Sequence, residues 1–164
     1  MADGTRQAMN AQIVHEFESE HLYLQLSAWF EEHKLPGFAH WMKVQAQEER
    51  GHGMKFFQHL VDRDWEIRLG PIGAPPAHFE TVQEVAQAVL DNERHVTHLI
   101  GDLVETAVQE HDHAAKVLLD WFVTEQVEEE ASADQLLADV RLAGDDATAL
   151  LYLDGRLAAR GGEA

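Results

Sequence analysis

The sequence contains no cysteine among its 164 residues. This absence excludes disulfide bonds, metal sites and iron–sulfur clusters held by thiolates, and cysteine nucleophiles, and it fits a reducing compartment. Long apolar runs are missing too, since none approaches the roughly 18 apolar residues that a membrane span needs. Residues 1–5 also lack the basic and apolar segments of a secretion signal. We therefore expect a cytoplasmic protein.

Basic residues are scarce. Twelve lysines and arginines stand against 30 aspartates and glutamates, which gives a formal net charge of −18 at pH 7. Such a charge repels nucleic acid and anionic membranes, so neither is an expected partner, and it attracts cations, metal ions among them. Many acidic proteins are charged only to stay soluble, so the charge favours metal binding without establishing it.

The strongest breaks in the helical pattern are few, at Pro36-Gly37, Gly70 to Pro76 and Gly144. They predict four long helices and a short fifth, at about residues 5–33, 36–64, 81–109, 112–143 and 145–160. The segment 65–80 contains three of the four prolines and suits a crossover along a helical bundle. We expect one all-α domain over residues 1–164, with a four-helix bundle at about 5–143.

Each long helix carries an apolar stripe, at a spacing of three or four residues, that turns polar near its middle. A carboxylate on such a face costs several kcal/mol to bury unless a cation or a hydrogen-bond partner meets it. Satisfied polar core residues would require a separate explanation in each of the four helices. The interrupting residues are Glu16, Glu20 and Tyr23, then Gln45, Glu49 and His52, then Glu93, then Gln126 and Glu129.

These interruptions are expected at one height in the bundle. Glu16, Glu49 and His52 lie 14 to 19 residues from the first predicted hairpin turn, near Leu35. Glu93, Gln126 and Glu129 lie 15 to 18 residues from the second, near His111. Because a helix rises about 1.5 Å per residue, the pattern predicts a single metal cluster in the core.

The pattern resembles that of the non-haem bacterial ferritins over nearly the whole chain. Ferritin-like diiron sites combine one glutamate from each of two helices with Glu-x-x-His from the other two, and Glu16, Glu93 and Glu49-x-x-His52 match this arrangement. The fourth helix has Gln126-x-x-Glu129 instead, which resembles ferritins proper and not bacterioferritins. One iron position should therefore be held more weakly.

The resemblance implies roles for these residues. Glu16, Glu49 and His52 would hold one iron, and Glu49 would bridge to a second iron bound by Glu93 and Glu129, with Gln126 beside it. Carboxylates suit hard ferric iron and can bridge two metals, while an imidazole adds affinity for ferrous iron.

Further candidates carry two interpretations each. Tyr23 resembles the tyrosine near ferritin diiron centres, or it is a core tyrosine with a satisfied hydroxyl. Glu48, Glu125 and Glu128 resemble an additional iron site that shares Glu129, or they form a solvated acidic face. Four histidines with metal-compatible spacing lie off the stripes or in a turn and are expected on the surface: His95, His98, His111 and His113.

The resemblance implies an iron-storage ferritin with ferroxidase activity. Fe(II) would be oxidised by dioxygen or peroxide, and ferric oxide would collect in a hollow homo-oligomeric shell of 24 subunits. The fifth helix would line a symmetry axis and find its packing partners across subunits, since it is too short to be stable alone. No haem is expected, because Arg50 stands where the haem-binding methionine of bacterioferritins would lie. The alternatives are a diiron oxidase or peroxidase that stores nothing, and a metal-free acidic helical scaffold.

Overall fold

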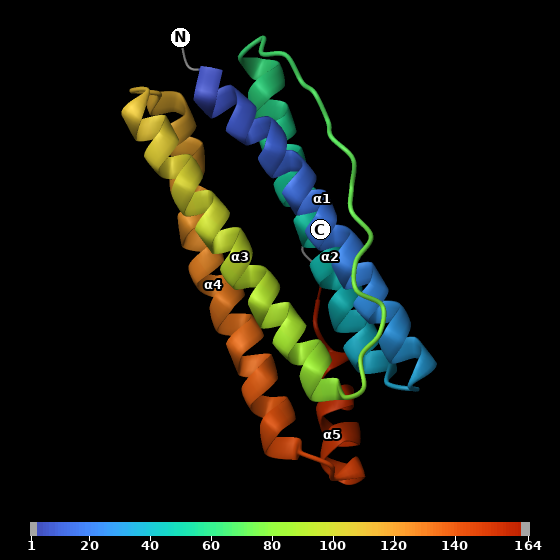
Figure 1. Cartoon of the computed structure of the whole chain (residues 1–164). Coiled ribbons are helices and arrows are strands. Elements are labelled where there is room, and N and C mark those ends of the chain that lie inside the picture. The colour runs from blue at the N-terminus through green and yellow to red at the C-terminus, as the bar shows by residue number, and fades with distance from the viewer. Residues whose placement is uncertain (1–2, 162–164) are drawn as a thin grey trace.

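The computed structural model describes residues 3–161, so the first two and last three residues of the predicted domain lie outside the described part. This range contains no strand. Its helices are α1 (Asp3–Glu32), α2 (Pro36–Asp62), α3 (Val82–Gln109), α4 (His113–Ala143) and α5 (Ala147–Leu157). Figure 1 shows α1 paired with α2 and α3 paired with α4, while the segment between α2 and α3 runs the length of the bundle. The predicted all-α bundle with one long crossover is confirmed.

Local signals decide where the helices begin. Pro36 is the first residue of α2, where its missing N–H costs nothing. The hydroxyl of Thr81 accepts a hydrogen bond from the backbone N–H of Glu84 at 3.1 Å, and the Glu84 carboxylate accepts one from the N–H of Glu80 at 2.8 Å. A capping box is thus present at the start of α3, with its return bond to the residue before the usual one. No helix among residues 3–161 is long and apolar enough to span a membrane.

Two hydrophobic clusters fill the bundle and leave a polar layer between them. One cluster contains Phe30 and Phe38 and lies toward the α5 end. The other contains Ile13 and Phe56 and fills the opposite half. In each of the four long helices the buried glutamate falls between the members of one cluster and the members of the other. The core therefore presents a buried polar layer at mid-height.

A spacing of three or four residues extends the inner stripes to His59 and Leu118, and these two residues, together with Glu20, lie beside the buried face instead. Each is only half-buried, and a chain neighbour takes the buried position. A helix turns by about 100° from one residue to the next. Whether the buried face continues at a spacing of three or of four residues therefore decides which of two neighbours faces the core. The exchanges are Ser19 for Glu20, Leu60 for His59 and Leu119 for Leu118.

The fifth helix is shorter than predicted, with 11 residues. It starts at Ala147 because the carboxylate of Asp146 accepts hydrogen bonds from the N–H groups of Thr148 and Ala149, at 2.8 and 3.1 Å. Helical structure ends at Leu157, three residues before the expected end.

α5 also packs on its own chain, so part of its packing lies within the subunit, and contacts across subunits remain a prediction. Leu153 is buried in the same cluster as Phe38. The carboxylate of Asp154 accepts a hydrogen bond from the N–H of Phe38 at 2.9 Å, at the start of α2. Gly37 permits this approach, since a Cβ there would lie 1.8 Å from the backbone oxygen of Asp154.

Candidate metal centre

The polar layer gathers ligand-type side chains from all four long helices. The predicted common height is confirmed, because these side chains meet in the core and none is more than 7% exposed. The set comprises Glu16 from α1, Glu49 and His52 from α2, Glu93 from α3, and Gln126 and Glu129 from α4.

The ligand atoms form two buried groups that share one residue. Glu16, Glu49 and His52 offer ligand atoms that all lie within 4.8 Å of one another, and so do Glu49, Glu93 and Glu129. A carboxylate has two oxygens, so Glu49 can serve both groups at once. The geometry therefore fits two neighbouring cations bridged by Glu49.

Buried amides orient these carboxylates. Gln12 donates to Oε1 of Glu16 at 2.8 Å. Gln45 donates from Nε2 to Glu49 at 3.0 Å and to Glu129 at 2.7 Å. Each glutamine precedes a ligand-type glutamate on its own helix by four residues, and this spacing was a usable sequence signal for both. Gln45 interrupts the predicted stripe, but the pattern indicated no role at the site for either glutamine.

Glu93 is held by groups from two other helices, α1 and α4. The hydroxyl of Tyr23 donates to Oε1 of Glu93, which agrees with a tyrosine at the centre and equally gives that hydroxyl a partner. Gln126 donates to Oε2 of Glu93 at 3.4 Å and to the hydroxyl of Thr97 at 3.3 Å. Gln126 thus lies beside the second group as an amide donor.

His52 carries a strongly altered pKa. Burial lowers it, but the hydrogen bond and the charge of Glu49, with the charges of Glu16 and Glu129, outweigh burial and raise the pKa to about 9. The ring nitrogen Nδ1 lies 3.2 Å from Glu49. Without a metal, His52 is therefore the cation that partly neutralises the cluster.

The pKa values of the buried carboxyl groups are also raised. Burial, followed by the charge of Glu49, raises the pKa of Glu129 to about 7 and that of Glu93 to about 8. Burial and Glu49 also raise the pKa of Glu16 well above its ordinary value. So many acidic groups cannot all ionise in a dry core without added positive charge.

These residues fit bound iron. Oε2 of Glu16 is buried and has no hydrogen-bond partner among the described residues, so one lone-pair position of the first group is unused. Carboxylate oxygens with a single imidazole form a hard, mixed donor set that suits Fe(II) and Fe(III). A cation at each group would replace the protons that these carboxyl groups retain because their pKa values are raised.

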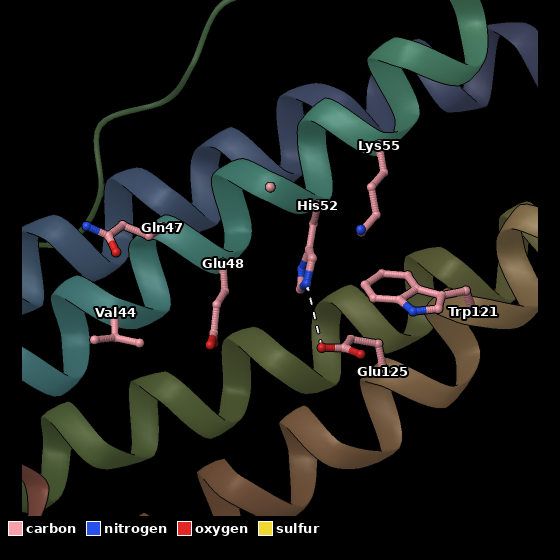
Figure 2. A pocket seen from close by; sticks show the side chains of 8 residues that line it. Val44, Gln47, Glu48, His52, Lys55, Trp121 and Glu125 are labelled. Atoms are coloured by element: carbon pink, nitrogen blue, oxygen red, sulfur yellow. Dashed lines mark ion pairs between the residues drawn. The ribbon is translucent and has the colours of Figure 1, made fainter. Parts of the chain in front are cut away.

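A pocket opens beside this centre. Figure 2 shows His52 and Glu125 facing each other across it. Glu48 lies on the same helix as His52, and Lys55 lies near Trp121. Nε2 of His52 lies 3.9 Å from Oε1 of Glu125.

A third group of ligand atoms adjoins the first two. His52, Glu125 and Glu129 also offer ligand atoms within 4.8 Å of one another, so Glu129 is shared as predicted. Glu48 lines the pocket with Glu125, whereas Glu128 is exposed and is not among the lining residues. The four histidines expected on the surface are exposed: His95, His98, His111 and His113.

Comparisons with known proteins agree with this geometry. Residues 6–143 match the family model of the ferritin-like domain. The chain is 38% identical over 160 residues to a bacterial non-heme ferritin of Bacteroides fragilis strain 638R, covering 98% of this chain and 99% of the relative. It is 35% identical over 153 residues to one of Staphylococcus saprophyticus, covering 93% and 92%.

Solved structures of an archaeal ferritin have the same fold. An engineered closed form of the Archaeoglobus fulgidus ferritin superimposes with a TM-score of 0.97 at 40% identity, covering 99% of each chain. The open-pore ferritin of that organism gives a TM-score of 0.95 at 40% identity, covering 97% of this chain and 98% of the other. By its family match and these relatives, the chain belongs to the ferritin family.

Proposed function

We propose that this protein is an iron-storage ferritin whose subunit oxidises Fe(II) at the buried centre. The observation that carries the proposal is the sharing of Glu49 by two ligand groups. Glu16, Glu49 and His52 hold one substrate iron, and Glu49, Glu93 and Glu129 hold the other. Membership of the ferritin family supports this assignment.

The bridging carboxylate makes a two-electron reaction available. Two Fe(II) ions held together give up one electron each, which reduces dioxygen to hydrogen peroxide, or peroxide to water, with the uptake of two protons. Binding of Fe(II) displaces protons from the carboxyl groups and from His52, because metal ligands must be deprotonated. The residues therefore exchange protons for iron.

The second position is suited to releasing its product. It has carboxylates from Glu49, Glu93 and Glu129 but no imidazole, and Gln126 beside it is uncharged. With Gln126 in place of the glutamate of the diiron pattern, iron at this position lacks a further charged ligand and can move on to a mineral. We assign Glu125, with shared Glu129 and His52, to an additional iron position on that route, lined also by Glu48.

Storage requires an enclosed space, so the proposal includes a homo-oligomeric shell of 24 subunits built from this single domain, without haem. The solved relatives include a ferritin described as open-pored and an engineered closed form of it. We expect α5, which is held to α2 by the hydrogen bond between Phe38 and Asp154, to line a symmetry axis of this shell.

Aerobic loading with Fe(II), followed by size-exclusion chromatography and iron analysis, tests the proposal. Many irons per chain should elute with a particle far larger than one subunit. A small particle that oxidises Fe(II) without retaining it would identify a diiron oxidase or peroxidase instead. A protein that neither oxidises nor binds Fe(II) would be an acidic helical scaffold.

A further inference from the structure

The segment after α5 returns along the bundle to α2, and Arg160 anchors it (Figure 1). Nε2 of His40, in the tautomer that donates, bonds to the backbone oxygen of Arg160 at 2.8 Å. The Arg160 guanidinium lies over the ring of Trp41, 4.5 Å from its centroid. Its side chain is only 22% exposed. Arg160 is thus held by both His40 and Trp41 and is not a loose surface charge.

The same guanidinium reaches toward the metal centre. Nη2 of Arg160 donates to Oε1 of Gln45 at 3.0 Å and to Oε2 of Glu48 at 2.7 Å. The other end of the Gln45 amide, Nε2, donates to Glu49 and Glu129. Two successive hydrogen bonds therefore connect the end of the chain to both of these carboxylates.

The contact with Arg160 fixes which way the Gln45 amide points. An amide has an accepting end and a donating end, and arginine can only donate. With Arg160 at Oε1, Nε2 must face the two carboxylates. Turned round, the amide would bring its oxygen against Glu49 and Glu129, where two acceptors would repel each other.

Arg160 also places a positive charge where an added cation would bind. Glu48 lines the pocket that contains His52 and Glu125, and its carboxylate forms an ion pair with Arg160. A cation entering this pocket gains less from Glu48 while the guanidinium is present, because two positive charges repel at short range.

We propose that Arg160 is a positioning residue for the diiron centre that also limits how many cations the region binds. It orients Gln45 toward Glu49 and Glu129, and its charge at Glu48 keeps a cation in the adjoining pocket weakly held. The inference rests on the proposed function of the central site.

Binding of Co(II), followed by isothermal titration calorimetry and visible absorption, tests the inference on the full chain. The variants are Arg160→Gln, Arg160→Lys and the control Arg156→Gln. Arg156 lies on α5, is 59% exposed and pairs only loosely with Asp139, at 3.8 Å. Circular dichroism checks that each variant folds.

Wild type and the Arg156 control should bind two Co(II) tightly and a third weakly. Arg160→Gln should bind the third about tenfold more tightly or better, since one nearby positive charge is lost. Its absorption spectrum for the first two Co(II) should also change as Gln45 is released. Arg160→Lys keeps the charge and should restore weak binding of the third ion.

Two results would overturn the inference in distinguishable ways. In the first result, every protein has two tight Co(II) sites, and wild type and Arg160→Gln have the same affinity for the third Co(II) and the same absorption spectrum. This result would exclude the role of Arg160 and would leave the proposed function standing. A wild type without tight Co(II) sites would remove the proposed function and the inference with it.

Discussion

The hydroxyl of Tyr23 donates a hydrogen bond to Oε1 of Glu93 in the middle of the bundle, and so joins α1 to α3. Burial and the charges of Glu49 and Glu129 raise the pKa of Glu93, and this hydrogen bond partly opposes the rise. The tyrosine thereby keeps a buried carboxyl group closer to the ionised form that binds iron.

Tyr23→Phe should slow the first oxidation of Fe(II) several-fold, because Glu93 then holds its proton more firmly. The variant should also lose about 1–3 kcal/mol of unfolding free energy, since a buried acceptor loses its donor. Stopped-flow absorbance and chemical denaturation measure the two effects. Tyr152→Phe is the matched control, because Tyr152 is 71% exposed. Equal rates in both variants would show that Tyr23 is only a core residue.

Glu49→Ala should abolish rapid oxidation of Fe(II), because neither ligand group is complete without the shared carboxylate. The metal-free variant should be as stable as wild type or more so, since Glu49 is a source of repulsion for Glu16, Glu93 and Glu129. Glu105→Ala, at an exposed position of α3, is the control. A wild-type rate in stopped-flow oxidation would refute the bridging role.

Metal-free protein should lose stability as the pH rises from 5 to 9. The pKa values of Glu129, Glu93 and His52 in the folded state, about 7, 8 and 9, exceed the ordinary values of 4.5 for glutamate and 6.5 for histidine. The folded chain therefore binds more protons than the unfolded chain in this window, and raising the pH favours unfolding.

Thermal denaturation from pH 5 to 9, with and without Co(II), checks this dependence. Co(II) replaces the missing protons, so the gain in midpoint temperature should be larger at pH 8 than at pH 6. In Glu49→Ala the metal-free curve should be flatter. A midpoint that rises steadily with pH in the metal-free wild type would contradict the assignment of a buried acidic cluster.

Glu125 and Glu128 should differ in their effect on iron traffic. Glu125 contributes to a third ligand group, whereas Glu128 is exposed. Glu125→Gln should leave the first oxidation of two irons per chain nearly unchanged but alter the iron-to-oxygen ratio and the rate of later additions. Glu128→Gln should match wild type. Oxygen uptake through successive Fe(II) additions measures both, and equal behaviour of the variants would return Glu125 to the solvated face.

The sequence by itself determined the four long helices and the level at which their polar residues meet. Glu49 and His52 share a face because they are three residues apart, and a constant helical rise sets the height of Glu16 and Glu93. These are local regularities of the backbone, so they can be read without knowing how the chain folds back. The start of α2 at Pro36 was predictable for the same reason.

Only the tertiary structure decided the contacts between distant segments. Nothing near Arg160 in the sequence points to Gln45, which is 115 residues away, and nothing near Asp154 points to the start of α2, 116 residues before it. The burial of Ser19 in place of Glu20 likewise followed from how neighbouring helices pack. Such contacts depend on the path of the whole chain, because the two partners carry no shared local pattern before folding brings them together.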